Sequence, residues 1–144
     1  MKKILLLISL AATFLTASTI EVKDAYARAT PPNMKNSAAF MVLENRSNKD
    51  VAIVKATSNV ANVVELHTHD MKNGVMTMYE IPQIDIKAKS TTVLKPGGLH
   101  IMLIGLHNSL NVGDKVEIEL EFNNGSKQKV VADVKSVMSG MKHH

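Results

Sequence analysis

Residues 63–81 read VVELHTHDMKNGVMTMYEI, two alternating runs that meet at Asn73-Gly74. Asn-Gly between such runs is a strong signal for a two-residue β-hairpin turn, because both residues tolerate the positive φ of a type I′ turn. With these residues in the turn, Lys72 pairs with Val75. The same register predicts two further cross-strand pairs, Met71 with Met76 and His69 with Met78.

Alternation divides the side chains of this hairpin between two faces, because neighbouring residues of a strand point to opposite sides. One face gathers imidazoles and thioethers, from His67, His69, Met71, Met76 and Met78. The other face carries Leu66, Val75, Tyr79 and Ile81, and we expect it to be the core side. His67 is a diagonal neighbour of Met78 in this register, so the pattern alone leaves either His67 or His69 as its partner.

The rest of the chain continues as short strands separated by turn residues. Gly, Asn and Pro mark the turns, since Gly and Asn tolerate positive φ and Pro fixes φ. Strands at roughly ten-residue spacing predict an all-β antiparallel sandwich or barrel. The predicted strands are Val22–Ala29, Ala38–Glu44, Val51–Thr57, Val63–Met71, Val75–Ile81, Thr92–Leu94, His100–Leu106, Val116–Phe122 and Lys129–Val137.

The composition of the 144 residues fits one domain with an ample core, since 45% of them are hydrophobic. The chain has no Cys, which excludes disulfides, thiolate zinc sites, iron–sulfur clusters and cysteine nucleophiles. It has nine Met and six His instead. No G-x-S-x-G pattern or assembled nucleophile–base set is visible, so we expect no enzyme.

The N-terminus predicts export. Lys2 and Lys3 precede an apolar run over 4–14 and then small residues, as in a signal peptide over 1–19. Cleavage after residue 17, 18 or 19 fits, and an uncleaved membrane anchor is the alternative. Removing this segment lowers the net charge from +4 to +2, because it takes two Lys and no acid. We therefore expect a nearly neutral exported protein that binds no nucleic acid and, once cleaved, no membrane.

A second group of donors follows Pro96-Gly97-Gly98, where His100-Ile101-Met102 begins a predicted strand. Residues two apart project to the same side, so His100 and Met102 can share one metal while Ile101 faces the core. Imidazole and soft thioether donors favour Cu(I) over zinc, calcium or magnesium. The alternative is that the Met residues merely pack. We interpret Met34 and Met41 as structural residues and His107 as a solvated surface residue.

The spacing His67-x10-Met78-x21-His100-x-Met102 resembles the motif of the PCuAC family of periplasmic copper chaperones. Similar segments cover the whole chain from about 22 to 137, among them DAYARATPP at 24–32 and LKPGGLHIML at 94–103. The resemblance implies a single cupredoxin-like, antiparallel Greek-key β-sandwich over 20–137. It also implies four Cu(I) ligands, His67, Met78, His100 and Met102. Thr68 and Tyr26 depart from the residues common in the family.

The resemblance further implies that copper is delivered by ligand exchange to the copper centre of cytochrome c oxidase, beside a Sco-type assembly factor. We expect a monomer. His69, Met71 and Met76 are auxiliary candidates by hairpin geometry. The segment 138–144, expected to be a flexible tail, adds Met138, Met141, His143 and His144, where Cu(II) is a further candidate. Two rival functions are a copper buffer without a dedicated acceptor and a non-metal interaction domain of the cell envelope.

Overall fold

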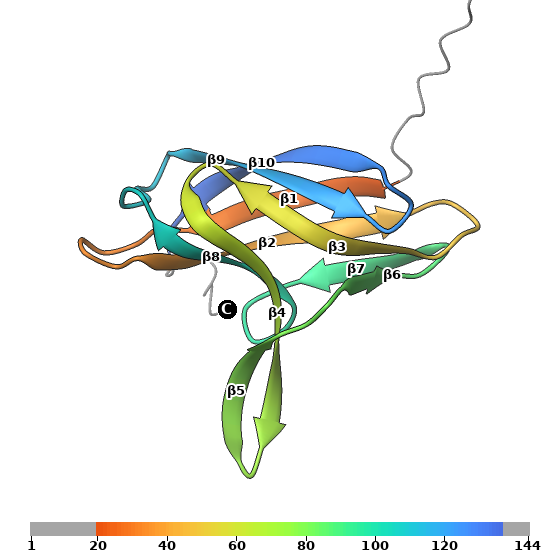
Figure 1. Cartoon of the computed structure of the whole chain (residues 1–144), viewed down its shortest axis with the longest axis horizontal. Coiled ribbons are helices and arrows are strands. Elements are labelled where there is room, and N and C mark those ends of the chain that lie inside the picture. The colour runs from red at the N-terminus through yellow and green to blue at the C-terminus, as the bar shows by residue number, and fades with distance from the viewer. Residues whose placement is uncertain (1–19, 137–144) are drawn as a thin grey trace, which may run out of the picture.

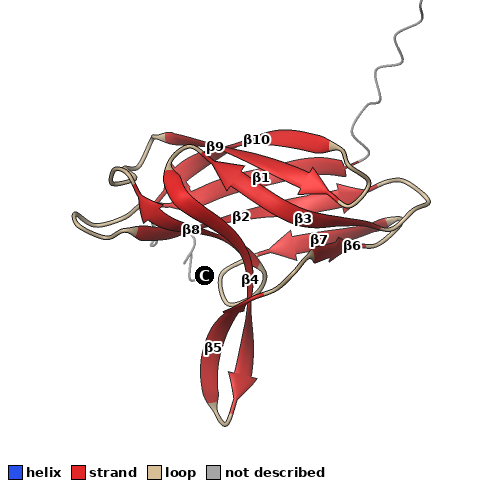
Figure 2. Ribbon diagram, viewed as in Figure 1, coloured by secondary structure: helices blue, strands red, loops and turns tan. Residues whose placement is uncertain are grey.

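The computed structural model describes residues 20–136, which form strands and connecting loops without any helix (Figures 1 and 2). Within this range no helix is long and apolar enough to cross a membrane. The strands are β1 (Ile20–Arg28), β2 (Asn36–Asn45), β3 (Val51–Ser58), β4 (Ala61–Lys72), β5 (Val75–Glu80), β6 (Ile84–Ile86), β7 (Ser90–Leu94), β8 (His100–Leu106), β9 (Lys115–Phe122) and β10 (Lys127–Lys135).

The strands pair in the order β5-β4-β8-β2-β1-β10-β9-β3-β6, and β7 also pairs with β2. The sheet bends so that its two halves face each other across one core (Figure 1). The predicted all-β Greek-key sandwich is confirmed. All its pairs are antiparallel except β1 and β10, which run parallel, with Tyr26 opposite Asp133. This exception joins the first and last strands, so no local turn signal could have predicted it.

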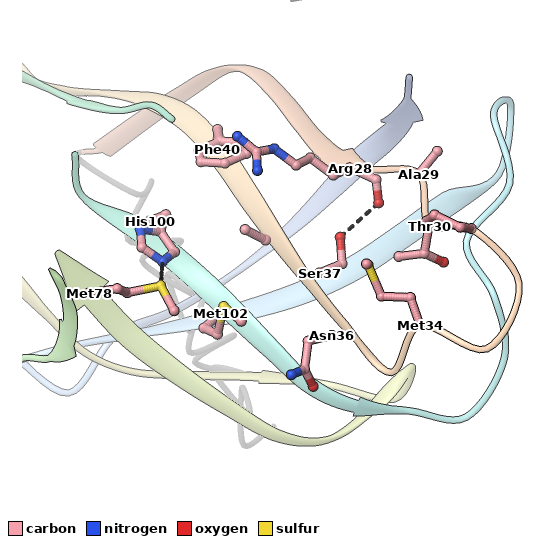
Figure 3. Close-up of a pocket in the computed structure, with 12 residues that line it drawn as sticks. Arg28, Ala29, Thr30, Met34, Asn36, Ser37, Phe40, Met78, His100 and Met102 are labelled. Carbon is pink, nitrogen blue, oxygen red and sulfur yellow. Dashed lines mark hydrogen bonds between the residues drawn. The ribbon is translucent and has the colours of Figure 1, made fainter. Parts of the chain in front are cut away.

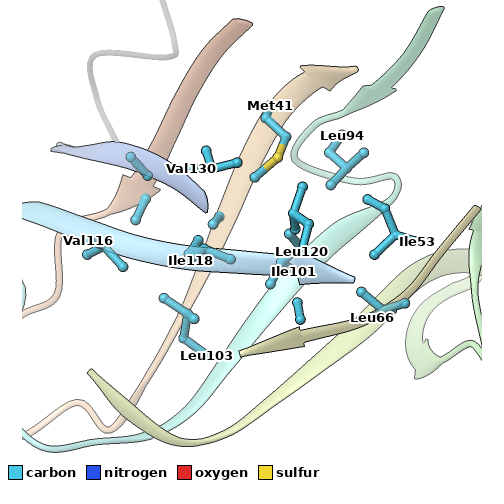
Figure 4. Close-up of a cluster of buried hydrophobic side chains, with 14 of the residues drawn as sticks. Met41, Ile53, Leu66, Leu94, Ile101, Leu103, Val116, Ile118, Leu120 and Val130 are labelled. Carbon is cyan, nitrogen blue, oxygen red and sulfur yellow. The ribbon is translucent and has the colours of Figure 1, made fainter. Parts of the chain in front are cut away.

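Strand alternation builds the core from both halves of the sheet. On β9 the pattern KVEIELEF buries every second residue, among them Ile118 and Leu120. These side chains meet Ile101 and Leu103 from β8, which are also fully buried (Figure 4). Ile101 therefore faces the core as predicted, and its neighbours His100 and Met102 point to the opposite face of β8.

Strand β2 has two successive partners along one edge. Its first part pairs with β8, up to Ala39 opposite Ile101, and its second part pairs with β7, from Met41 opposite Leu94. Between the two partners the chain leaves the sheet in the loop 95–99, where Gly97 adopts a φ of +81°. The chain rejoins the sheet at His100, so this residue begins β8 directly after the loop, as the sequence predicted.

A bulge in β1 orients the residues that support this region. The register against β2 shifts between Lys23 and Tyr26, and Asp24 has a φ of +54°. After the bulge, Tyr26 lies opposite Phe40, and the centroids of their rings are 5.2 Å apart. The Arg28 guanidinium lies 5.1 Å from the centroid of the same Phe40 ring. Phe40 is thus enclosed on the face that carries His100.

The hairpin of β4 and β5 has the register predicted from Asn73-Gly74, with Lys72 opposite Val75 and His69 opposite Met78. Both turn residues have positive φ, 52° and 76°. The hairpin projects away from the sandwich (Figure 1), so all of β5 is exposed. The prediction that Val75 faces the core is therefore wrong, and so is that for Tyr79. No second layer covers this part of β5 within the described residues, whereas Leu66 at the base is buried as expected.

The remaining differences concern short or terminal segments. The structure adds β6, whose three residues Ile-Asp-Ile were too few to predict from alternation. The last strand ends at Lys135, two residues before its predicted end. The predicted signal peptide over 1–19 and the tail 138–144 lie outside the described residues.

Candidate metal site

Strands β4, β5 and β8 bring the predicted donors to one face. His67 on β4 pairs with His100 on β8, and His69 pairs with Met78 on β5. The His100 Nε2 atom lies 3.0 Å from the Met78 sulfur, and both side chains point toward each other from different strands (Figure 3). Residues separated by more than twenty positions thus converge on one point.

His100 is fixed from two sides. Its Nδ1 lies 3.0 Å from the Gly98 carbonyl oxygen, which can only accept a hydrogen bond, so Nδ1 carries the proton and donates. The Phe40 ring packs against the imidazole, with a centroid distance of 6.2 Å. The residue is buried, with 2% exposure, and this burial lowers the pKa of His100 below 6.5. The neutral imidazole therefore presents the lone pair of Nε2 to Met78.

Met102 and Met78 line a hollow of about 440 Å³ beside His100 (Figure 3). Met102 is partly buried, and Met78 is 44% exposed. The hollow extends over the end of β1 and the start of β2 as far as Met34, whose exposed side chain points into it from the far rim. Met34, interpreted from the sequence as structural, therefore lies on the same surface hollow as three of the predicted ligands, Met78, His100 and Met102.

His67 is buried, and its ring centroid lies 5.6 Å from that of His100. Its Nε2 lies 2.7 Å from a Glu65 carboxylate oxygen. Its Nδ1 is buried and has no hydrogen-bond partner within residues 20–136. A carboxylate oxygen can only accept a hydrogen bond, so Nε2 donates in this contact, and Nδ1 is the ring nitrogen of His67 left to bind a ligand.

His69 is also close to the predicted centre. Its ring centroid lies 5.0 Å from that of His100, nearer than the ring of His67. Its Nδ1 lies 3.3 Å from the same Gly98 oxygen that accepts from His100. The structure thus brings both histidines of β4 to His100, and His69 is the one directly opposite Met78.

Two carboxyl groups outside the predicted ligand set complete this face. Glu65, Glu80 and His67 offer ligand atoms within 4.8 Å of one another. The hydrogen bond from His67 lowers the pKa of Glu65, while the hydrogen bond and negative charge of Glu65 raise the pKa of Glu80. Glu65 precedes His67 by two residues, and the predicted register already placed Glu80 opposite His67, so both were within reach of the pattern.

The other candidates lie apart from this centre. Met71 and Met76 pair with each other near the exposed tip of the hairpin. Met41 is fully buried in the core, as expected of a structural residue. His107 is exposed as predicted, and its Nε2 lies 2.8 Å from the Asn62 side-chain oxygen. The tail candidates Met138, Met141, His143 and His144 lie outside the described residues.

Comparison with known proteins identifies the family. The model of the LpqE-like family, described as "Putative lipoprotein LpqE-like", matches residues 20–134. This chain belongs to the LpqE-like family. One relative is the "Putative lipoprotein Lxx21020" of Leifsonia xyli subsp. xyli, 38% identical over 120 residues, which are 83% of this chain and 71% of that protein. The "Uncharacterized protein RP573" of Rickettsia prowazekii is 31% identical over 99 residues, 68% of this chain and 54% of that protein.

Solved structures agree with this membership and confirm the resemblance to PCuAC domains. The solution structure of CuI-DR1885 from Deinococcus radiodurans is 31% identical, with a TM-score of 0.66 over 91% of this chain and 86% of that one. The copper-bound PCuAC domain from PmoF2 has a TM-score of 0.71 over 83% of this chain and 94% of that one. Its identity of 18% supports the shared fold alone.

Proposed function

We propose that this LpqE-like protein is a Cu(I) chaperone of the cell envelope. In this proposal His67, Met78, His100 and Met102 hold the ion, and His69 is an auxiliary or alternative ligand. Thioethers and neutral imidazoles bind a metal without first losing a proton, unlike a thiol. They suit a soft monovalent cation better than they suit zinc or magnesium.

The contact between His100 and Met78 carries the proposal. Because Nδ1 of His100 donates to Gly98, its Nε2 has a lone pair and no proton. The Met78 sulfur, 3.0 Å away, also offers only lone pairs. Two acceptors that face each other without a hydrogen between them repel, and a cation bound by both removes that repulsion. The donor set therefore fits Cu(I) in both its softness and its orientation.

The exposure of the donors suggests how the ion would be released. His100 is buried and held by the loop 95–99, whereas Met78 is 44% exposed on the projecting hairpin. An acceptor can therefore add its own donor to Cu(I) before the Met78 thioether leaves. Copper keeps its oxidation state and is never free in solution. The protein thus exchanges ligands with a docked acceptor and catalyses no covalent change.

Relatives support the cargo and the compartment. The similar PCuAC domain from PmoF2 is copper-bound, and the similar structure of DR1885 is that of its CuI form. The family and one relative are named as lipoproteins, which agrees with a place in the envelope. We extend this to a periplasmic protein exported by residues 1–19. We also propose that its acceptor is the copper centre of cytochrome c oxidase, with a Sco-type factor alongside.

A titration of Cu(I) against a competing chelator under reducing conditions tests the site. Replacing Met78 and Met102 together by Leu should weaken binding by at least about tenfold, since even residues that only support ligands cost that much. Met41→Leu is the matched control, because it removes a thioether that is buried in the hydrophobic core. A double variant that binds as tightly as the parent would refute the proposed ligands.

Two further experiments separate the remaining alternatives. Single His67→Ala and His69→Ala variants in the same titration identify the histidine of β4 that binds, and we expect the larger loss for His67. Mixing copper-loaded protein with the isolated copper domain of an oxidase tests delivery. Transfer without release to a chelator in solution supports a chaperone, and retention of the copper favours a buffer.

A further inference from the structure

The tip of the β4–β5 hairpin exposes two thioethers that the proposed centre does not use. Met71 is 61% exposed and Met76 is 52% exposed, and the two residues are direct cross-strand partners. Exposed apolar side chains on a projecting element often mark a site of interaction. Here both are sulfur donors, so a metal is a candidate ligand as well as a protein.

The geometry of the turn brings these two side chains together. In a two-residue hairpin the pair beside the turn, Lys72 and Val75, is the hydrogen-bonded one, and pairs then alternate. Met71 and Met76 therefore form a non-hydrogen-bonded pair, in which the backbones approach most closely, with about 4.5 Å between Cα atoms. The positive φ of Asn73 and Gly74 fixes this turn. The two sulfurs can thus reach a common ion without a change of fold.

This pair continues the row of donors that leads to His100. Alternation puts Met71 on the same side of β4 as His69, and Met76 on the same side of β5 as Met78. The next pair on that side, His69 with Met78, lies about 7 Å further along the strands. From the tip inward the donors change from two exposed thioethers to a mixed pair and then to the buried imidazole of His100.

We propose that Met71 and Met76 form a second, weaker Cu(I) site through which copper enters and leaves the inner centre. This inference rests on the proposed function and adds a route to it. A donor complex gives up Cu(I) to the two exposed sulfurs, and Met78 then takes the ion as one tip thioether leaves. Each step forms one copper–ligand bond and breaks one, and no electron or proton is transferred.

The order of the donors gives the route its direction. Two neutral thioethers in water hold Cu(I) more weakly than a set that includes imidazole nitrogen in a partly buried site. Copper therefore moves inward when the inner centre is empty. When an acceptor with stronger donors docks at the tip, the same row lets the ion move outward. The tip sets the rate of exchange, and the inner ligands set the affinity.

Two double variants of the full chain separate a metal site from a docking patch. Changing Met71 and Met76 to Leu keeps the apolar surface and removes the sulfurs, whereas changing both to Ser removes both properties. Rapid mixing with a small Cu(I)–chelator complex measures loading, and equilibrium competition measures affinity. We expect the Leu variant to keep its affinity within about twofold and to load about ten times more slowly, since the lost site affects rates more than equilibrium. The Ser variant should be equally slow.

The methyl signals of the methionines in an NMR titration provide a second measurement. The first equivalent of Cu(I) should shift Met78 and Met102, and the second should shift Met71 and Met76. The proposal is overturned if the Leu variant loads at the parental rate, whether or not the Ser variant is slow, or if the second equivalent leaves the tip signals in place. If Met78→Leu with Met102→Leu leaves the affinity unchanged, the proposed function itself fails, which is a distinct result.

Discussion

Replacement of Phe40 by Ala should damage both the fold and the proposed copper centre, because the Phe40 ring packs against His100. Phe40 is 2% exposed and contacts the rings of Tyr26 and His100 at centroid distances of 5.2 Å and 6.2 Å. The Arg28 guanidinium also packs on Phe40, 5.1 Å from the centroid of its ring. Removal of a fully buried Phe side chain costs about 3–5 kcal/mol in transfer and cavity terms. A domain of this size has only about 5–15 kcal/mol of stability in total.

Urea unfolding followed by far-ultraviolet circular dichroism measures this loss without tryptophan, which the chain lacks. We expect the free energy of unfolding to fall by about 3–5 kcal/mol, with a slope close to that of the parent. Copper affinity should fall by about tenfold, since a residue that orients a ligand typically contributes that much. Phe40→Leu, which keeps much of the volume, should fold more stably than Phe40→Ala and still bind copper more weakly than the parent.

Val131→Ala is the control, because the Val131 side chain is 59% exposed on β10. It should change the stability by no more than about 0.5 kcal/mol. A loss of less than about 1 kcal/mol for Phe40→Ala would show that the ring is not packed as described. If Phe40→Ala loses the expected stability but Phe40→Leu binds copper as tightly as the parent, the proposed role of Phe40 in orienting His100 is refuted.

Two further predictions concern protons and backbone. Burial lowers the pKa of His100 below 6.5, so the unfolded chain takes up this proton first as the pH falls. The free energy of unfolding of the metal-free protein should therefore decrease below about pH 6.5, and it should decrease less in His100→Gln. Urea unfolding at several pH values measures this decrease, and the same pH dependence in the parent and in the variant would contradict it. Gly105 has a φ of +69°, and a Cβ there would lie 2.9 Å from the Asn62 Nδ2. Gly105→Ala should cost about 1–2 kcal/mol in thermal unfolding, and an unchanged midpoint would refute the strain.

The hairpin shows how far local sequence decides structure. Asn73-Gly74 determines its turn and register by itself, so the pairing of His69 with Met78 followed from the sequence. The same register also placed Glu80 opposite His67, so this pair too followed from the turn. The exposure of Val75 depends instead on whether another layer covers the hairpin. That is a property of the whole sandwich, and alternation along one strand does not contain it.

The surroundings of His100 show which part of the site could not be predicted from the sequence. The pattern His100-x-Met102 predicted two donors on one face, and the buried Ile101 confirms the alternation. Nothing in the pattern indicated that the Gly98 carbonyl accepts from His100, since this depends on the path of the loop 95–99. The support from Phe40 depends equally on long-range pairing, because β2 and β8 are joined across more than fifty residues.

The parallel pairing of β1 with β10 determines at which end the domain can be attached to another body without covering the face of His100. Ile20 begins β1 opposite Asn45, whereas Arg28 at its other end lines the hollow beside His100 and pairs with Lys135. The nine extended residues of β1 separate these two ends by roughly 30 Å. An attachment ahead of Ile20 would therefore leave the face that carries His100 open to an approaching partner. An attachment after Lys135 would lie beside that face and hinder the approach of a partner.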